Sequence, residues 1–484
     1  MRLITLAVFI SVLVCAVMPA ASAPVVTQII DAQGDGVHPV TYPMALAVDS
    51  SRNVFVADVA RAFRIGADGT ISQIVDATGD GVHPLGSPNY LTTDPMGIVY
   101  LSAARFEPPY SESVFRITPA GTISQVLDGT GDGIHPMTLP FPVATDSIGN
   151  LYVGAIWSGN VFRRTPDGTI TQLLDATGDG VHPLSYPCGL AVDANDNVYV
   201  LDSDGIFQLD PGGAVTRFVP FKPLGCGLDV DKDLNLYAIE CVGCSPFFEV
   251  LYRSRVVRIA PDGTRTTVLS PDGDGTSEFR LGLWVKVDGE GTVYAAAAAP
   301  LDFAWGTNNV FRVTTDGAVT EILDTSGDGT HPMSDPTGGL AVDSIGDVYV
   351  AAISTNNVFR ISFPLEVAID IKPGSGSNPV NLRSRGVLPT AILGSSTLHV
   401  DQIDVDTLAF GPAHAAPAHD PGNAVTRAAH TQDVNADGFP DLVVHFAVQE
   451  TGIACGDTAA SLSGALRSGK TLEGSDTITT LGCK

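Results

Sequence analysis

Oxygen-bearing side chains alternate along one short run near the C-terminus, DVNADGFPD. Carboxylate and amide oxygens are the ligands that Ca²⁺ prefers, and a glycine within the run permits the sharp turn that wraps such an ion. No nucleophile accompanies the run, so we expect calcium to stabilise the fold rather than to catalyse a reaction. An Asp-rich turn without an ion is the alternative. The expected ligands are the side chains of Asp433, Asn435, Asp437 and Asp441 and the backbone carbonyl of Phe439.

A second pattern that could do chemistry is a loop, GDGxHP, which occurs five times. Asp and His side chains repeated on one rim could bind several cations, or a glycan together with a cation. Under the structural interpretation, which we favour, Asp-Gly supplies a turn with positive φ, His packs or bonds locally, and Pro sets the entry into the next strand. The candidate ligands are Asp31, Asp35, His38, Asp76, Asp80, His83, Asp128, Asp132, His135, Asp175, Asp179, His182, Asp324, Asp328 and His331.

Six cysteines follow the N-terminal apolar segment, and an even number in an exported chain favours disulfides. One pair stands in matching repeat contexts and could join neighbouring units, a second could close a local loop, and a third lies near the C-terminus. Zinc or redox chemistry at the CxxC run is the alternative. The candidate pairs are Cys188 with Cys226, Cys241 with Cys244, and Cys455 with Cys483.

Three insertions interrupt the regular pattern of the chain: RFEPPYSES, ECVGCSPFFEVLYRSR and APLDFAWGTNN. Aromatic side chains in loops often contact a partner, although packing within the long loops would also account for them. The candidate partner contacts are Tyr110, Phe247, Phe248, Tyr252, Asp302 and Trp305.

Seven copies of one pattern carry these loops, in the form LAVDSSRNVFVA from Leu46 or LAVDSIGDVYVA from Leu340. Each copy contains two hairpins separated by Asp- and Gly-containing turns, and four antiparallel strands per repeat make a propeller blade. The run from Val25 to Asp31 matches only a fourth strand, and the last copy stops after its third, at Ile361. We therefore expect an all-β fold, a seven-bladed β-propeller over residues 24–363 whose N-terminal strand completes the last blade.

The repeated motifs, such as LAVDSIGDVYV and RIAPDGT, resemble NHL repeats over about Pro24 to Phe363. Similar propellers include protein-binding modules, sensor domains, gluconolactonase-type hydrolases and virginiamycin B lyase-like enzymes, so the resemblance implies a fold more than an activity. A gluconolactonase-type metal would need Glu, Asn and Asp side chains from the inner strands, and a lyase of the second type would need a converging His and Glu. The matching inner-strand positions are mostly small and neutral, with one Asp and one Lys that could pair: Ala47, Thr92, Ala144, Ala191, Asp229, Lys286 and Ala341.

The repeat pattern ends after Phe363, and the sequence that follows consists of short β-rich segments interrupted by Gly, Pro and Ser. It predicts a small β-sandwich-like domain over residues 364–484. The segments IDIKPGS, GVLPTAILG and ETGIACGDT resemble a module appended to secreted bacterial proteins. The run DVNADGFPD resembles the calcium loops of FG-GAP repeats and, less closely, of dockerins and EF-hands. Because Val444 stands where an EF-hand has Glu, and LVVHF follows, a strand-flanked calcium site is favoured.

The chain opens with Arg2, an apolar run from Leu3 to Val17 and small residues up to Ala23, which predicts a signal peptide over residues 1–23 and a secreted or periplasmic protein. A net charge of −27 makes nucleic acid and anionic membranes poor partners. No later run is long enough to span a bilayer. We expect a monomeric binding scaffold for an unknown protein, glycan or small-molecule ligand. A secreted hydrolase or lyase that uses the propeller channel, and multivalent cation or glycan binding by the rim loops, are the rivals.

Overall fold

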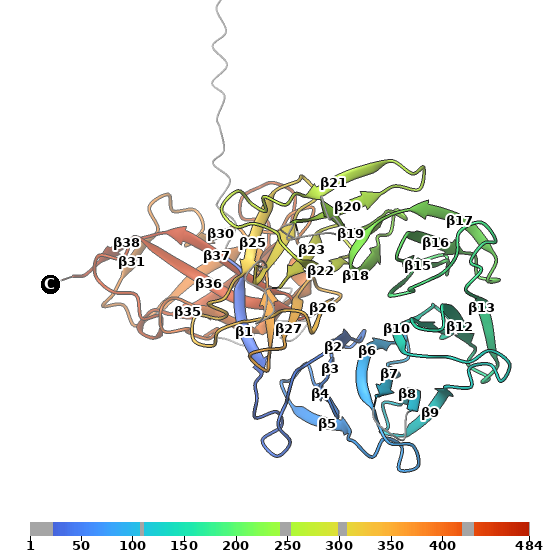
Figure 1. The fold of residues 1–484 in the computed structure, drawn as a ribbon. Helices are drawn as coiled ribbons and strands as arrows, with labels where there is room; N and C mark the ends of the chain where they lie inside the picture. The colour runs from blue at the N-terminus through green and yellow to red at the C-terminus, as the bar shows by residue number, and fades with distance from the viewer. Residues whose placement is uncertain (1–22, 107–110, 243–252, 299–306, 419–429, 484) are drawn as a thin grey trace, which may run out of the picture. The chain divides into compact units, whose positions relative to one another are not determined.

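A computed structural model describes residues 23–106, 111–242, 253–298, 307–418 and 430–483. The strands form seven four-stranded antiparallel sheets between Pro24 and Ser362, and a separate group of sheets from Phe363 onward. The chain thus has the expected fold, a seven-bladed β-propeller and a small β-sandwich-like domain, coloured from blue to red along the chain in Figure 1. Within the described ranges, no helix is long and apolar enough to cross a membrane.

Each of the first six blades takes four consecutive strands, ordered from the channel outward. Blade 1 consists of β2 (Ala45–Val48), β3 (Val54–Ala57), β4 (Ala62–Ile65) and β5 (Ile71–Val75). Blade 2 consists of β6 (Ser87–Thr93), β7 (Val99–Arg105), β8 (Ser111–Ile117) and β9 (Ile123–Asp128). Blade 3 consists of β10 (Pro140–Thr145), β11 (Leu151–Ala155), β12 (Asn160–Arg164) and β13 (Ile170–Leu174). Blade 4 consists of β14 (Gly189–Val192), β15 (Val198–Asp202), β16 (Gly205–Leu209) and β17 (Val215–Pro220). Blade 5 consists of β18 (Pro223–Val230), β19 (Leu236–Val242), β20 (Arg253–Ile259) and β21 (Arg265–Leu269). Blade 6 consists of β22 (Gly282–Val287), β23 (Val293–Ala297), β24 (Asn309–Val313) and β25 (Val319–Leu323).

Blade 7 joins the two ends of the propeller. It consists of β26 (Gly339–Val342), β27 (Val348–Ala352), β28 (Asn357–Ser362) and, as its outer strand, β1 (Val25–Ile30). The antiparallel register runs from Val25 opposite Ser362 to Ile30 opposite Val358. Figure 1 shows the blue strand β1 beside the orange strands of this blade. Pairing between the two ends of the sequence leaves the ring without an open blade, as the repeat alignment predicted.

Neighbouring blades pack through two faces of different composition. The face of blade 1 with Ala45, Ala47 and Ala57 contacts a face of blade 2 with Leu91 and Leu101. Alternation along a strand sends successive side chains to opposite faces, so small residues at one position make room for branched residues from the next blade. This alternation decides which neighbouring blade each inner-strand side chain packs against.

An aspartate at the end of each inner strand, buried in five of the blades and half-buried in blades 5 and 6, organises the turn that follows. In blade 3, Asp146 accepts hydrogen bonds from the Asn150 backbone N–H at 2.8 Å and from the Tyr152 hydroxyl at 3.0 Å. Burial and the neighbouring carboxylate raise the pKa of Tyr152 to about 12, so its hydroxyl keeps its proton and remains a donor. Tyrosines in blades 4 to 7 donate in the same way to the aspartate six residues earlier.

The C-terminal domain contains two four-stranded sheets and a two-stranded one. The first is ordered β29 (Leu365–Glu366), β37 (Thr471–Thr477), β36 (Ala459–Leu466), β33 (Ile403–Phe410), and the second β30 (Ile369–Ile371), β32 (Val387–Ile392), β35 (Asp441–Ala447), β34 (Thr431–Gln432). The remaining elements are β31 (Pro379–Asn381), β38 (Thr479–Leu481) and the 3₁₀ turns η1 (Val400–Gln402) and η2 (Val448–Glu450). Phe410 and Phe446 stack across the two sheets with ring centroids 4.9 Å apart, inside one continuous core.

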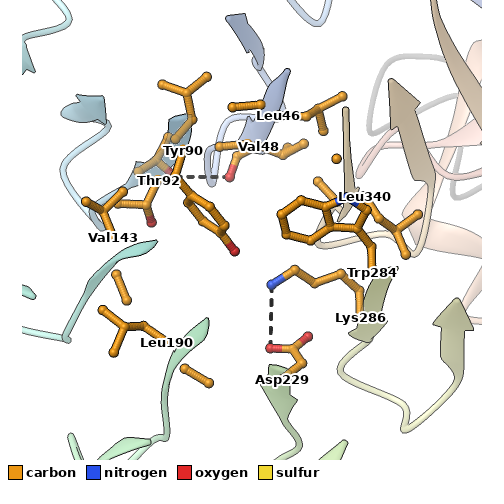
Figure 2. A pocket seen from close by; sticks show the side chains of 18 of the residues that line it. Leu46, Val48, Tyr90, Thr92, Val143, Leu190, Asp229, Trp284, Lys286 and Leu340 are labelled. Carbon is orange, nitrogen blue, oxygen red and sulfur yellow. Dashed lines mark hydrogen bonds and ion pairs between the residues drawn. The ribbon is translucent and has the colours of Figure 1, made fainter. Parts of the chain in front are cut away.

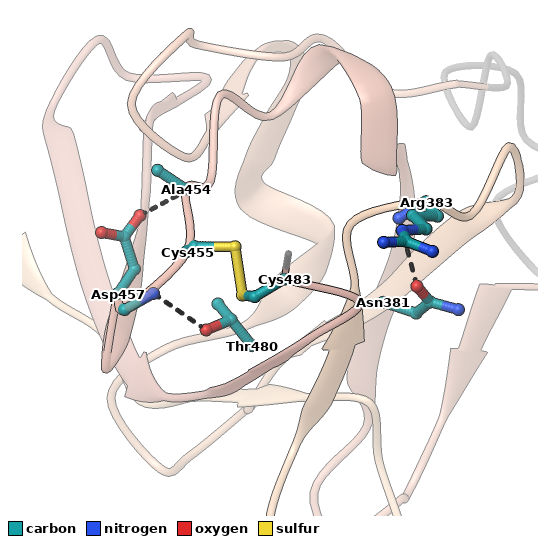
Figure 3. The surroundings of a disulfide bond; sticks show 8 residues. Asn381, Arg383, Ala454, Cys455, Asp457, Thr480 and Cys483 are labelled. Atoms are coloured by element: carbon teal, nitrogen blue, oxygen red, sulfur yellow. Dashed lines mark hydrogen bonds between the residues drawn. A yellow bond between two sulfur atoms is a disulfide. The ribbon is translucent and has the colours of Figure 1, made fainter.

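A disulfide joins Cys455 to Cys483 with their Cα atoms 5.7 Å apart, which is the pairing expected from the sequence (Figure 3). It ties the segment before β36 to the end of the chain. Next to it, the Gly456 backbone N–H donates to the Thr480 hydroxyl at 3.1 Å. The link therefore holds the last strand against the body of the domain, and we expect it to restrict fraying of this end.

A candidate binding site in the propeller channel

The innermost strand of every blade contributes to one cavity of about 330 Å³ on the propeller axis. Its lining includes aliphatic side chains such as Leu46, Val143, Leu190 and Leu340. The Thr93 hydroxyl donates to the Val48 carbonyl at 3.0 Å, so a side chain satisfies part of an inner-strand edge that has no further strand to pair with. Figure 2 shows the labelled aliphatic side chains around the rings of Tyr90 and Trp284 and the side chain of Lys286. The volume is at the low end of small-molecule pockets.

Two aromatic side chains meet across this channel. Tyr90 belongs to β6 in blade 2 and Trp284 to β22 in blade 6, and their ring centroids are 5.7 Å apart. Tyr90 also contacts Phe141 of blade 3 at 6.0 Å. The Trp284 indole N–H donates to the Thr337 carbonyl at 2.8 Å, which fixes the orientation of the indole. Because blades 2 and 6 are not neighbours, this contact spans the channel and forms an aromatic wall of the cavity.

One charged pair lies in the same cavity. The Lys286 amine is 3.6 Å from the Asp229 carboxylate, and the other oxygen of Asp229 accepts the Val287 backbone N–H at 2.9 Å. Burial lowers the pKa of Lys286, but the Asp229 carboxylate outweighs this effect, so the net pKa is raised and the amine stays protonated. Burial raises the pKa of Tyr90, so its hydroxyl also keeps its proton. The ion pair suggested by the sequence is therefore present.

These protonation states restrict the chemistry of the cavity. A lysine that attacks a carbonyl must lose its proton near neutral pH, and a tyrosine that acts as a base needs a lowered pKa. The pKa values of Lys286 and Tyr90 are instead both raised. Both groups are suited to donating hydrogen bonds to a bound molecule.

Tyr90 and Trp284 were not predicted from the sequence, although a signal for them exists. Both stand immediately before the first residue of the repeat pattern. The other blades have small residues or proline at that position: Ala45, Pro142, Gly189, Gly227 and Gly339. An extra Cβ on Gly227 would lie 2.8 Å from the Leu283 carbonyl oxygen, so a larger side chain does not fit there. An alignment extended by one position would have singled out the two aromatic residues.

The repeated rim loops have a shared internal geometry. Each of the five histidines contacts the aspartate three residues earlier through Nδ1, at 2.9 to 3.0 Å. In one of the loops, the hydrogen bond from His182 lowers the pKa of Asp179 to about 2. Asp80 additionally accepts the Gln125 backbone N–H of the next blade at 3.1 Å, and Asp328 accepts that of Gln28 at 3.4 Å. The first aspartate of each loop, namely Asp31, Asp76, Asp128, Asp175 or Asp324, accepts the N–H two residues later.

The loop carboxylates thus accept hydrogen bonds within the loops and, at Asp80 and Asp328, from an outer strand of the next blade. In the part of the chain that the structure describes, no three His, Cys, Asp or Glu side chains gather so as to hold a metal. Four of the loops nevertheless expose an aliphatic side chain at their tips, with 78 to 81% of its surface accessible: Val37, Val82, Ile134 and Val181.

The other cysteines differ in part from the expectation. Cys188 and Cys226 are free thiols, so the suggested disulfide between blades 4 and 5 is absent. A hydrogen bond with Cys226 and burial raise the pKa of the Cys188 thiol, which disfavours the thiolate that disulfide formation requires. Cys241 is in a disulfide. Its expected partner, Cys244, lies outside the described residues, as do the candidate partner contacts Tyr110, Phe247, Phe248, Tyr252, Asp302 and Trp305.

The candidate calcium loop is an exposed turn between β34 and β35. Asp433 accepts the backbone N–H groups of Asp437 at 3.2 Å and Gly438 at 3.0 Å, so the loop curls around this carboxylate. The Asn435 amide donates to Asp437 at 2.8 Å. Asp441 is fully buried and accepts the backbone N–H groups of Gly394 and of Val434, the latter within the same loop, each at 2.8 Å. Oxygen donors of the kind calcium prefers are thus present on one short turn.

Comparisons with known proteins support the fold. No protein-family model matches the chain, and no curated protein matches it. Among solved structures, the extracellular domain of a proposed hybrid two-component system from B. thetaiotaomicron is 14% identical, with a TM-score of 0.50, over 95% of this chain and 60% of that one. A streptogramin B lyase is 13% identical, with a TM-score of 0.49, over 70% of this chain and 97% of that one.

A catalytically inactive virginiamycin B lyase from Staphylococcus aureus, solved with quinupristin, is 17% identical, with a TM-score of 0.49, over 69% of this chain and 98% of that one. The neighbours are β-propeller proteins. At these identities the likeness extends to the fold alone.

Proposed function

We propose that this protein is a secreted binding propeller that holds a small molecule in its central channel. The cavity lined by all seven blades, with its aromatic wall and one charged pair, carries the proposal. Its volume of about 330 Å³ suits a small molecule rather than a protein segment or a branched glycan. Lys286 and Tyr90 stay protonated, which supports binding over a hydrolase or lyase reaction that starts from either group.

A metabolite screen by thermal shift on the full mature chain tests this proposal. We expect at least one compound to raise the melting temperature, because a ligand that binds only the folded state stabilises it. Ala191→Leu adds a larger side chain to the channel wall and should weaken the binding of that compound at least tenfold. Val181→Ser, at the tip of a rim loop, should leave the affinity for the compound unchanged. A compound that binds the Ala191→Leu protein as tightly as the unchanged protein would place the ligand outside the channel.

Export is part of the proposal. The supporting features are the apolar segment before Ala23 and the position of the expected cleavage site, which lies just before β1 begins at Val25 and so leaves the closing strand whole. N-terminal sequencing of the protein recovered from the producing cells should give Pro24 as the first residue.

We also propose that the C-terminal turn binds one calcium ion, using Asp433, Asn435, Asp437 and Asp441 and the carbonyl of Phe439. The supporting features are the donor types, their spacing and the positive φ of Gly438, +92°. The ion would supply structural cross-linking of the turn, and these side chains would hold it.

Calorimetry on the chelator-stripped chain should therefore show about one Ca²⁺ per molecule, and saturation at about 100 times Kd should stabilise the fold by about 2.7 kcal/mol. Asp437→Ala should abolish the binding, whereas Asp132→Asn in a rim loop should not change it. Several equivalent ions that survive Asp437→Ala would instead assign metal binding to the GDGxHP loops.

A further inference from the structure

The channel tyrosine, Tyr90, differs from the tyrosines in the second strands of blades 3 to 7, because its hydroxyl does not donate to an aspartate of its own blade. Tyr152, Tyr199, Tyr237, Tyr294 and Tyr349 each donate to a turn aspartate of their own blade. Among the described residues, the Tyr90 hydroxyl has no hydrogen-bond partner. Figure 2 shows it directed toward the Lys286 amine. The Tyr90 hydroxyl can therefore donate a hydrogen bond to an acceptor on a bound molecule.

The Lys286 amine also has donor capacity to spare. An ammonium group offers three donors, and its contact with Asp229, at 3.6 Å, is longer than a hydrogen bond. Asp229 is held separately by the Val287 backbone N–H. About a third of the Lys286 side chain is accessible, so a molecule in the cavity can reach the amine. Two donors, from blades 2 and 6, therefore point into one space.

The charge balance in the cavity restricts what can accept these bonds. Among the lining residues, the positive charge of Lys286 is matched by the negative charge of Asp229. A charged ligand would leave an unbalanced charge in a partly desolvated site, which is costly. A neutral carbonyl avoids this cost, and its oxygen has two lone pairs, one for each donor. Trp284, fixed by its bond to Thr337, offers a flat apolar surface beside them.

We propose that the channel recognises a neutral, ring-bearing carbonyl compound, a carboxamide or a ketone, whose oxygen accepts hydrogen bonds from Tyr90 and Lys286 and whose ring lies against Trp284. This rests on the proposed small-molecule function of the channel and defines the ligand class. Tyr90 and Lys286 are binding residues in this arrangement, and Asp229 is a positioning residue that balances the charge of the amine.

Matched pairs of neutral and anionic probes test the proposal on the full mature chain. Benzamide is compared with benzoate and indole-3-acetamide with indole-3-acetate, with D-glucose as a polar ring without an amide. Binding is followed by NMR through the Trp284 indole N–H signal, which Trp284→Phe assigns among the three tryptophans. We expect this signal to shift with the amides and each amide to bind at least ten times more tightly than its acid.

Two variants then locate the carbonyl. Tyr90→Phe keeps the aromatic wall and removes only the hydroxyl, so it should weaken amide binding about tenfold, as the loss of a hydrogen bond to a ligand does. Lys286→Met should weaken it at least as much, and Tyr186→Phe, at an exposed rim tyrosine, should have no effect. The Tyr90→Phe comparison remains decisive if Lys286→Met fails to fold.

Preference for the acids or for glucose, no binding of any probe, or unchanged amide binding to Tyr90→Phe would each overturn the inference. The small-molecule function of the channel is tested separately, by whether Ala191→Leu weakens the binding of the compounds found in the metabolite screen.

Discussion

A chain that begins at Asp31, and so lacks β1, is expected to lose the cooperative thermal transition of the propeller or to melt at least 10 °C lower. Without β1, the edge of β28 has no partner and the ring has an open blade. The truncation also exposes the contacts of Ile30, which is 3% accessible, and removes the Gln28 bond to Asp328. Losses of this kind together amount to several kcal/mol.

Differential scanning calorimetry measures this, and a chain that begins at Pro24 is the matched control, since it keeps the whole strand. Ile30→Asp provides a second test without shortening the chain, because an unpaired charge in the blade interior costs several kcal/mol. An unchanged transition in the truncated chain would show that the ring does not depend on this closure.

The two glycines of one rim loop should respond very differently to the same substitution. Gly79 has φ +64°, and a Cβ there would lie 2.0 Å from the His83 carbonyl oxygen. Gly81 has φ +85°, and no atom of the described residues lies within 4 Å of its Cβ position. We expect Gly79→Ala to destabilise the propeller by about 3 kcal/mol or more, from the clash and the left-handed backbone together, and Gly81→Ala by about 1 kcal/mol from the backbone alone.

Urea denaturation of the two variants beside the unchanged protein measures the difference. The loop at Gly178 and Gly180 repeats the comparison in another blade. A Cβ on Gly178 would lie 1.8 Å from the His182 carbonyl oxygen, whereas no atom of the described residues lies within 4 Å of a Cβ on Gly180. Equal losses at the two positions would mean that the loop relaxes, and that the close approach is not what requires glycine.

These predictions separate the stability of the propeller from its binding site. The closing strand and the rim glycines hold the blades in place, and neither lies in the cavity. The residues that give the cavity its chemistry, Tyr90, Asp229, Trp284 and Lys286, depart from the repeat at positions where the other blades have small or neutral side chains. In a closed ring of similar blades, such departures can be tolerated at the centre because a cavity already exists there.

The blades could be predicted from sequence because their signals are local. Alternating side chains, Asp- and Gly-containing turns and one repeated pattern all act over a few residues, so each copy specifies a four-stranded sheet. The role of β1 followed from counting strands in the first and last copies. The pairing of Cys455 with Cys483 also agreed with the structure, whereas Cys188 and Cys226 do not form the suggested bond.

The sequence by itself therefore determined the number of blades, the closure of the ring and the one Lys–Asp pair among the inner positions. Only the tertiary structure decided that Tyr90 meets Trp284 across the channel and that the Tyr90 hydroxyl faces Lys286. The reason is geometric. Ring closure brings together residues of blades 2, 5 and 6 that are distant in sequence, and no local pattern encodes which side chains then converge on the axis.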